Sequence, residues 1–142
     1  MRIILASVLL LAAGCASTGG DRPADVAKPE IRVNRVGPVF FGSSPTTSVS
    51  IDVHVTNRAA VPILVREVEI SSQGASQYTI ERARELFHET IPPGETRTVN
   101  LVATAIALQS GVTEGEPMPV RVTLRLEANG KSFRETKLDR LP

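Results

Sequence analysis

The chain of 142 residues is poor in the residue types on which several common functions depend. Its single cysteine excludes an intramolecular disulfide framework and any cysteine-based zinc site. Tryptophan is absent and aromatic residues make up 4% of the chain, so surfaces that stack nucleic-acid bases or sugar rings are not expected. Lysine and arginine number 16 against 15 acidic residues, a balance that argues against a basic nucleic-acid-binding protein. We therefore expect one domain without nucleic acid as a partner and without a cofactor.

Hydrophobic residues are concentrated in one short run at the N-terminus. Ile3–Ala13 is apolar except for Ser7, and it follows the single positive charge of Arg2. As a helix this run would rise about 16 Å, which is too short for a hydrocarbon core of about 30 Å. The pattern predicts a cleaved signal peptide over residues 1–14 and not a membrane span.

The run ends in Leu11-Ala12-Ala13-Gly14-Cys15, which resembles the lipobox of bacterial lipoproteins. The leucine stands one position earlier than in the commonest form of that motif. In such proteins the cysteine is acylated and becomes the mature N-terminus, so the resemblance implies a lipid on Cys15 that anchors the protein to a membrane. Ala16 is not the aspartate that resembles an inner-membrane retention signal, which favours the outer membrane, facing the periplasm.

The segment after this cysteine has no periodic apolar pattern. Residues 15–29 contain Gly19, Gly20, Pro23 and Pro29, which interrupt regular structure. We expect a flexible tether that spans at most about 50 Å. Without residues 1–14, basic and acidic side chains number 15 each, so the mature chain has a formal net charge of zero.

Residues 30–142 show the period-two alternation of half-buried strands. The clearest example is Val49–Val55, where Val49, Ile51, Val53 and Val55 alternate with polar residues. Alternating segments begin at Ile31, Val49, Val61, Tyr78, Val99, Val120 and Lys131. About seven short strands with turns every 8–12 residues predict an all-β fold, an antiparallel β-sandwich of immunoglobulin-like or fibronectin-like type.

Three places in this pattern are irregular. The apolar phase changes between Val65 and Val68, which predicts a β-bulge near Arg66. Residues 81–89 fit either a short helix or a strand, and we favour a strand or irregular structure slightly. Pro92-Pro93-Gly94 predicts a type II turn, and residues 105–119 read as a longer connection.

Asn129-Gly130 is the strongest short-range hairpin signal in the chain. A two-residue turn pairs Ala128 with Lys131 and Leu126 with Phe133. It then pairs Leu124 with Glu135 and Val122 with Lys137, which places two charges on the inward row. Either a bulge shifts the last strand, or that strand is a sheet edge whose inward charges deter edge-to-edge pairing.

Ser50, Asp52 and His54 are the residue types of a catalytic triad on one strand face. Neighbours on one face of a strand stand about 6.6–7 Å apart, whereas a proton relay needs contacts of about 2.6–3.2 Å. The chain also has no Gly-x-Ser-x-Gly elbow. We therefore expect a solvated polar strand face and no catalytic residues.

Metal ligands are sparse. His54, His88, Asp52 and Glu89 are the candidates, and their spacing matches no zinc or copper signature. Sandwich-type periplasmic copper carriers rely on clustered Met and His, and Met118 is the one methionine of the mature chain. A periplasmic hydrolase or metal carrier that uses His54 with Asp52 or His88 stays an alternative function.

Charged side chains suggest a surface role at most. Arg121 and Arg125 share an outward face with Glu127, which could contact a partner, although a solvated face is favoured. The run from Glu81 to Glu85 balances its own charges and is interpreted as solvated surface.

Two stretches resemble the late embryogenesis abundant group 2 domain, also called the water-stress and hypersensitive-response domain. In this family an apolar strand leads into an Asn-Pro-Asn-like turn, then proline and a second apolar strand. Asn57 and Pro62 match this pattern, and Arg58 replaces the expected proline. Ile91-Pro92-Pro93-Gly94-Glu95 is similar to a later Pro-rich turn. The resemblance spans 31–138 and implies a small Greek-key β-sandwich that binds or protects at a membrane or envelope surface.

Together these observations predict a lipid-anchored envelope lipoprotein whose β-sandwich is a non-enzymatic binding, structural or stress-protection module. Its partners would be the membrane and a protein or envelope component. A third hypothesis is an accessory subunit of an envelope secretion or transport complex.

Overall fold

The computed structural model describes residues 20–74, 76–109 and 117–142. The predicted signal peptide, Cys15 and residues 110–116 of the predicted connection lie outside these ranges. Eight strands follow one another: β1 (Glu30–Val36), β2 (Thr46–Thr56), β3 (Ile63–Ser72), β4 (Tyr78–Ile80), β5 (Ala83–Ile91), β6 (Thr96–Ala107), β7 (Met118–Ala128) and β8 (Lys131–Leu141).

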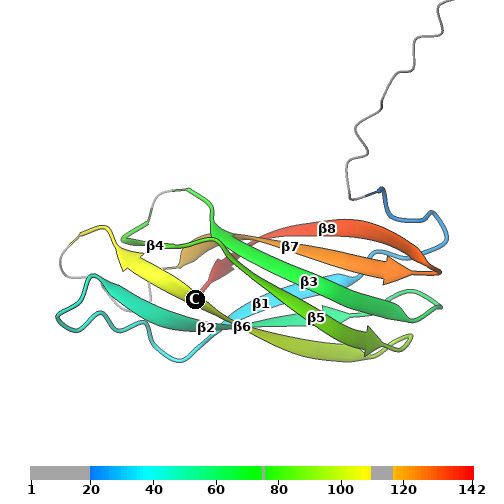
Figure 1. Ribbon diagram of the computed structural model, residues 1–142, viewed down its shortest axis with the longest axis horizontal. Coiled ribbons are helices and arrows are strands. Elements are labelled where there is room, and N and C mark those ends of the chain that lie inside the picture. Colours follow the sequence, from blue (N-terminus) through cyan, green and yellow to red (C-terminus); the bar gives the residue numbers. More distant parts are fainter. Residues whose placement is uncertain (1–19, 75, 110–116) are drawn as a thin grey trace, which may run out of the picture.

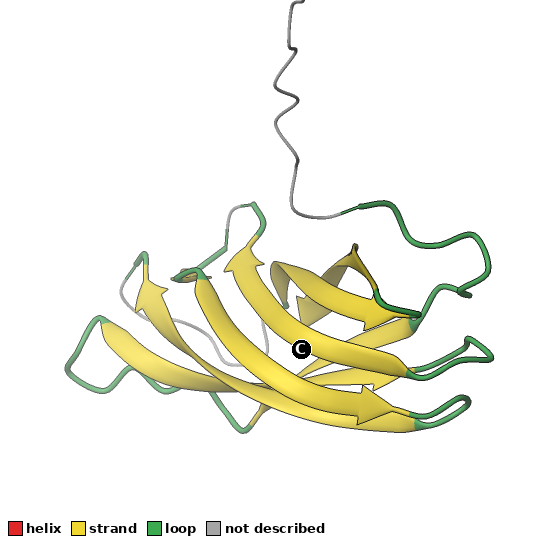
Figure 2. Cartoon of the chain, turned by 45° about the vertical axis from the view of Figure 1, so that its right-hand side comes forward, coloured by secondary structure: helices red, strands yellow, loops and turns green. Residues whose placement is uncertain are grey.

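The strands form two four-stranded antiparallel sheets packed face to face (Figures 1 and 2). One sheet has the order β1-β2-β6-β4 and the other the order β5-β3-β7-β8. No helix within the described ranges is long and apolar enough to cross a bilayer. The predicted fold class, an antiparallel β-sandwich compatible with an immunoglobulin-like domain, is confirmed.

The core lies between the two sheets and follows the predicted alternation. Ile51 and Val53 of β2 are fully buried, as are Val122 and Leu124 of β7 in the opposite sheet. Their neighbours in sequence face solvent, because successive side chains of a strand point to opposite faces. Burying each such side chain contributes about 1.5–3 kcal/mol.

The chain changes sheet between β4 and β5. β4 pairs with β6, and β5 pairs with β3 of the other sheet, so Glu81 and Arg82 cross from one layer to the next. Residues 83–89 are therefore strand, which confirms the favoured interpretation and excludes the helix. This crossing also makes the strand count eight, where about seven were predicted.

Two local predictions about backbone geometry are confirmed. The register of β3 against both neighbours shifts between Val65 and Glu67, which makes Arg66 the bulge residue. At the turn after β5, the Glu95 amide donates to the Pro92 carbonyl at 3.1 Å. Gly94 has φ = 77°, the positive value that the third residue of a type II turn requires.

The β7–β8 hairpin has the predicted register, with Leu126 opposite Phe133 and Leu124 opposite Glu135. Asn129 and Gly130 have φ values of 51° and 70°, as expected for a type I′ turn. No register shift occurs, so the alternative with inward charges on an edge strand is correct.

Residues 20–29 are packed against this edge, and for them the prediction of a flexible tether is wrong. Gly20 forms a parallel bridge with Phe133, and the Val26 side chain is fully buried. The inward Glu135 carboxylate is 2.9 Å from Arg22 Nε and 3.9 Å from Lys28 Nζ. A buried carboxylate needs a partner, and this segment supplies two cations while it covers the edge of β8.

Candidate functional site: an arginine face on one sheet

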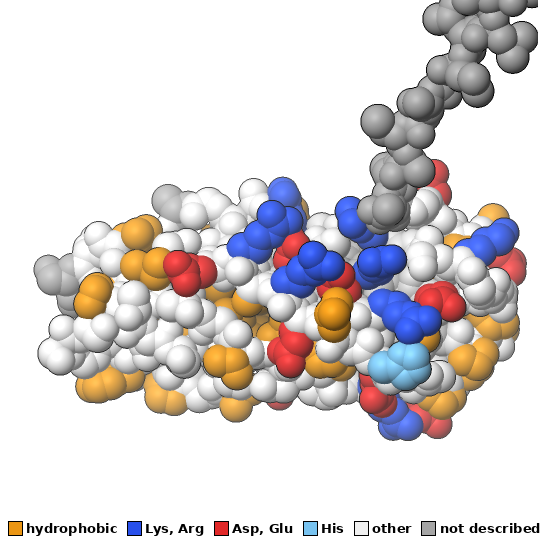
Figure 3. All heavy atoms as spheres, in the orientation of Figure 1, with side chains coloured by type: hydrophobic (Ala, Val, Ile, Leu, Met, Phe, Trp, Pro, Cys, Tyr) orange, Lys and Arg blue, Asp and Glu red, His pale blue; other side chains and the backbone are white. Residues whose placement is uncertain are grey.

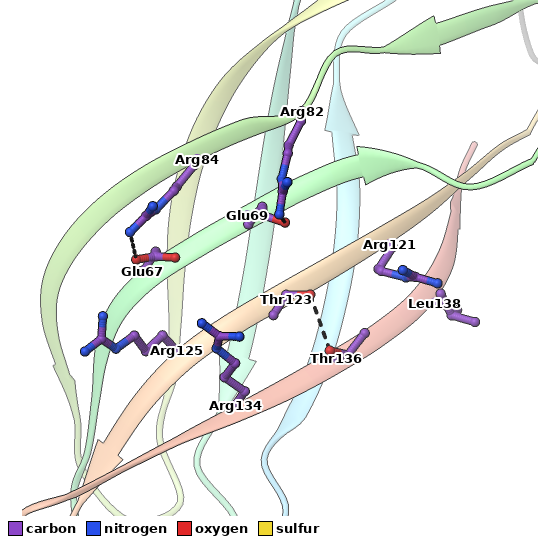
Figure 4. Close-up of a pocket in the computed structure, with 10 residues that line it drawn as sticks. All are labelled: Glu67, Glu69, Arg82, Arg84, Arg121, Thr123, Arg125, Arg134, Thr136 and Leu138. Carbon is purple, nitrogen blue, oxygen red and sulfur yellow. Dashed lines mark hydrogen bonds and ion pairs between the residues drawn. The ribbon is translucent and has the colours of Figure 1, made fainter. Parts of the chain in front are cut away.

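The outer surface of the β5-β3-β7-β8 sheet holds a shallow depression of about 660 Å³ in which charged side chains gather (Figures 3 and 4). We call this surface the arginine face. It is lined by Glu67, Glu69, Arg82, Arg84, Arg121, Thr123, Arg125, Arg134, Thr136 and Leu138. Five arginines and two glutamates give it a formal charge of +3.

Both glutamates of the arginine face are already engaged by arginines from the neighbouring edge. Arg84 donates to Glu67 Oε2 at 2.6 Å, and Arg82 lies 2.8 Å from Glu69 Oε1 (Figure 4). The hydrogen bond and charge of Glu69 raise the pKa of Arg82 above its usual value. These two pairs are satisfied within the protein.

The other three arginines, Arg121, Arg125 and Arg134, form no ion pair or side-chain hydrogen bond with any residue that the structure describes. Arg125 of β7 stands directly opposite Arg134 of β8 in the ladder. Like charges placed directly opposite on neighbouring strands destabilise a sheet. Glu67 stands opposite Arg125 on the other side, in β3, but its carboxylate is bonded to Arg84. The Arg125–Arg134 pair therefore has no ion-pair partner of its own, and an anion would relieve its repulsion.

The chemistry of this surface is that of anion recognition. A guanidinium presents a planar fork of donors that matches the oxygens of a phosphate or carboxylate. Arg121 and Arg125 are four residues apart on β7, which places them about 13 Å from each other along the strand. Thr123 and Thr136, joined at 3.3 Å between hydroxyl oxygens, lie between these positions and can also donate. The face is suited to several anionic groups spread over a surface.

The β3 bulge sets one border of the arginine face. It directs Arg66 toward Glu127 Oε2, which accepts from Nε at 3.0 Å and from a terminal nitrogen at 2.8 Å. The other terminal nitrogen of Arg66 donates to His88 Nδ1 at 3.0 Å. A second depression of about 380 Å³ joins this border to Arg125 and to the exposed Leu86.

The residues of the rejected triad lie on the outer face of the opposite sheet, and they do not contact one another. The Asn100 amide nitrogen donates to Ser50 Oγ and to Asp52 Oδ1, both at 2.8 Å. His54 accepts from the Asn34 amide at Nε2, 3.1 Å away, and its Nδ1 lies 2.7 Å from the Thr98 hydroxyl. Both ring nitrogens of His54 are thus occupied by neutral side chains.

The metal candidates are also separated. His54 is on β2 and His88 is on β5, in different sheets. Among the described residues, no group of three or more His, Cys, Asp or Glu side chains could hold a metal ion. Met118 is fully buried in the core, 3.7 Å from the Ser72 hydroxyl. The structure does not bring together the residues on which a metal-carrier function would rest.

His54 borders a polar depression of about 520 Å³ whose charges are paired. Glu30 accepts from Arg58 and from Arg32, the latter at 2.8 Å from Nε. These hydrogen bonds, that of Arg58 first, hold the pKa of Glu30 below its usual value. Unlike the arginine face, this surface shows no excess of unpaired charge.

Only part of the arginine face can be predicted from the sequence. Arg121 and Arg125 are predicted on an outward row, which is interpreted as solvated surface. The predicted hairpin register also sets Arg125 opposite Arg134, because the residues that flank an inward pair face outward. Arg82 and Arg84 were assigned to a self-balanced run, whereas their partners are Glu69 and Glu67 of β3.

Comparisons with known proteins define the fold and nothing finer. No family model matches the chain, and no curated protein matches it. Among solved structures, it is similar to Northeast Structural Genomics Consortium target SoR45, with a TM-score of 0.56 and 12% identity over 80% of this chain and 84% of that one. A yeast GGA1 GAE domain matches with a TM-score of 0.49 and 13% identity, over 85% of this chain and 95% of that one. At such identities the similarity concerns the fold alone.

Proposed function

We propose that the protein is a lipid-anchored lipoprotein of the bacterial envelope whose β-sandwich is a non-enzymatic module that binds an anionic partner through the arginine face. The observation that carries the binding role is the cross-strand pair of Arg125 and Arg134, which forms no ion pair among the described residues; Glu67, opposite Arg125 on β3, is bonded to Arg84. A sheet that tolerates this repulsion gains stability when an anion binds there.

The anchor and its site in the outer membrane rest on the lipobox-like sequence that ends in Cys15. Two or three long acyl chains hold a protein on a bilayer almost permanently, at about 0.8 kcal/mol for each buried methylene. The resemblance to the late embryogenesis abundant group 2 domain at Asn57 and Pro62 supports a non-enzymatic role at an envelope surface.

The anchor is tested by Cys15→Ala in cells that are fed a labelled fatty acid. We expect the label to disappear from the protein and the protein to leave the membrane fraction. A Cys15→Ala variant that still carried labelled lipid would contradict the assignment.

Anion binding is tested by calorimetric titration of the intact protein with inorganic tripolyphosphate. We expect binding that weakens with salt and that Arg125→Gln combined with Arg134→Gln removes. The matched control, Arg32→Gln with Arg97→Gln, deletes the same charge from the other sheet and should bind like the unmodified protein. Equal losses in both double variants would refute a specific site and leave only a net-charge effect.

A further inference from the structure

The described chain starts beside the arginine face. Gly20 pairs with Phe133 of β8, and the next residue of β8, Arg134, points outward into that face. Figure 1 shows the start of the described chain at the β7–β8 hairpin end of this sheet. Because residues 20–29 are packed on the domain, the chain between Cys15 and Gly20 spans at most about 17 Å. The fifteen-residue tether predicted from the sequence would have allowed about 50 Å.

Charge distinguishes the two outer faces of the sandwich. The arginine face carries +3, while the mature chain as a whole is formally neutral, so the remainder carries −3. The outer face of the other sheet holds Asp52 on β2 and, at β1, Glu30 paired with Arg32 and Arg58. These four side chains sum to a formal charge of zero. A surface of negative charge would therefore attract one face and not the other.

We infer that the arginine face lies on the phosphate groups of the bilayer in which the chain's own lipid is inserted. This inference rests on the proposed lipid anchor at Cys15. The short connection keeps Gly20 within reach of the headgroups, and the charge difference selects which side of the sandwich turns toward them. The occupant is a surface of phosphates and not a single bound anion.

The form of the arginine face fits an array of phosphates. Its depression is shallow and has lining residues from all four strands of the sheet, and its unpaired guanidinium groups are distributed along β7 and across to β8 (Figure 4). Phosphate oxygens accept bidentate hydrogen bonds from arginine. A phosphate between Arg125 and Arg134 would remove the repulsion of this pair, and the exposed Leu138 at the other end could enter the headgroup layer.

The orientation can be measured by thiol labelling, because acylation consumes the single native cysteine. Thr136→Cys places the one free thiol in the arginine face, and Thr104→Cys places it on the exposed outer row of β6. The acylated protein is reconstituted into vesicles of phosphatidylcholine alone, or with about one-third phosphatidylglycerol, and labelled with a charged maleimide. We expect the Thr136→Cys thiol to react at least about tenfold more slowly in the anionic vesicles, and the Thr104→Cys thiol to react equally in both.

Two further conditions test whether arginine charge causes the protection. About 0.5 M NaCl, which shortens the Debye length to about 4 Å, should restore the labelling of Thr136→Cys. Adding Arg125→Gln and Arg134→Gln should restore it at low salt, whereas Arg32→Gln with Arg97→Gln should not.

The outcomes separate this inference from the proposed function. Protein that fails to float with either kind of vesicle contradicts the anchor. Protein that floats but shows equal Thr136→Cys labelling in both lipids overturns the docking alone. Protection by added polyglutamate in neutral vesicles, without protection by anionic lipid, also overturns docking and assigns the face to an acidic polypeptide.

Discussion

Removal of the buried Asn57 amide should destabilise the domain strongly, although this residue lies in a connection between strands. The Asn57 side chain is fully buried where β2 leads into β3. Its amide nitrogen donates to the carbonyls of Val61 and Ile91 at 2.8 and 2.9 Å, and its oxygen accepts from the Ala59 amide at 2.8 Å. The side chain thus joins its own loop to the end of β5.

The magnitude follows from these three bonds. A protein hydrogen bond contributes about 1 kcal/mol net, and buried partners that lose theirs carry a further penalty. We therefore expect Asn57→Ala to lower the free energy of unfolding by about 3 kcal/mol and the melting temperature by about 10 °C. Asn57→Asp should be at least as harmful, because it sets a carboxylate against two carbonyl oxygens.

Asn100 provides a matched control. Its amide also makes three hydrogen bonds, to Ser50, Asp52 and the Ile51 carbonyl, but the residue is exposed. Water can replace those bonds, so Asn100→Ala should cost less than about 1 kcal/mol. Urea denaturation of both variants gives the comparison. Equal losses would refute the argument that burial, and not the number of bonds, decides the cost.

Three further predictions concern charge, the N-terminal segment and a turn. Arg134→Glu should raise the free energy of unfolding by about 0.5–1 kcal/mol at low salt, because a pair with Arg125 replaces a repulsion; a loss of stability in urea denaturation would contradict this. Arg22→Ala should loosen residues 20–29 and speed cleavage by endoproteinase Asp-N before Asp25, and an unchanged cleavage rate would show that the ion pair does not hold the segment. Gly94→Ala should cost about 1–2 kcal/mol in thermal unfolding, because φ at this position is 77°; a neutral effect would mean that the turn rearranges.

Much of the fold could be predicted because its determinants are local. Strand alternation has a period of two, so the change of phase between Val65 and Val68 required an extra residue, and the bulge is at Arg66. Likewise, a two-residue turn at Asn129-Gly130 fixes every later pair of the hairpin, including the inward Glu135.

The remaining features depend on contacts between distant segments. Residues 20–29 have the composition of a tether, and their packing depends on a buried carboxylate more than a hundred positions later. The pairing of Arg82 and Arg84 with β3 depends on a register across the bulge and on a strand that changes sheet. Contacts between distant strands leave no local pattern in the sequence. The sequence therefore identifies only Arg121 and Arg125 of the arginine face as outward residues that could contact a partner.

The packed N-terminal segment also has a mechanical consequence for an anchored protein. A pull on the chain from the membrane acts first on the Gly20–Phe133 bridge and the Arg22–Glu135 pair, and only then on the strands. Peeling Arg22 to Lys28 away would add about 25 Å of reach and uncover the Val26 side chain, while both sheets stay intact. In the anchored protein proposed above, residues 20–28 would therefore act as a reserve of length, released under tension before the sandwich itself is strained.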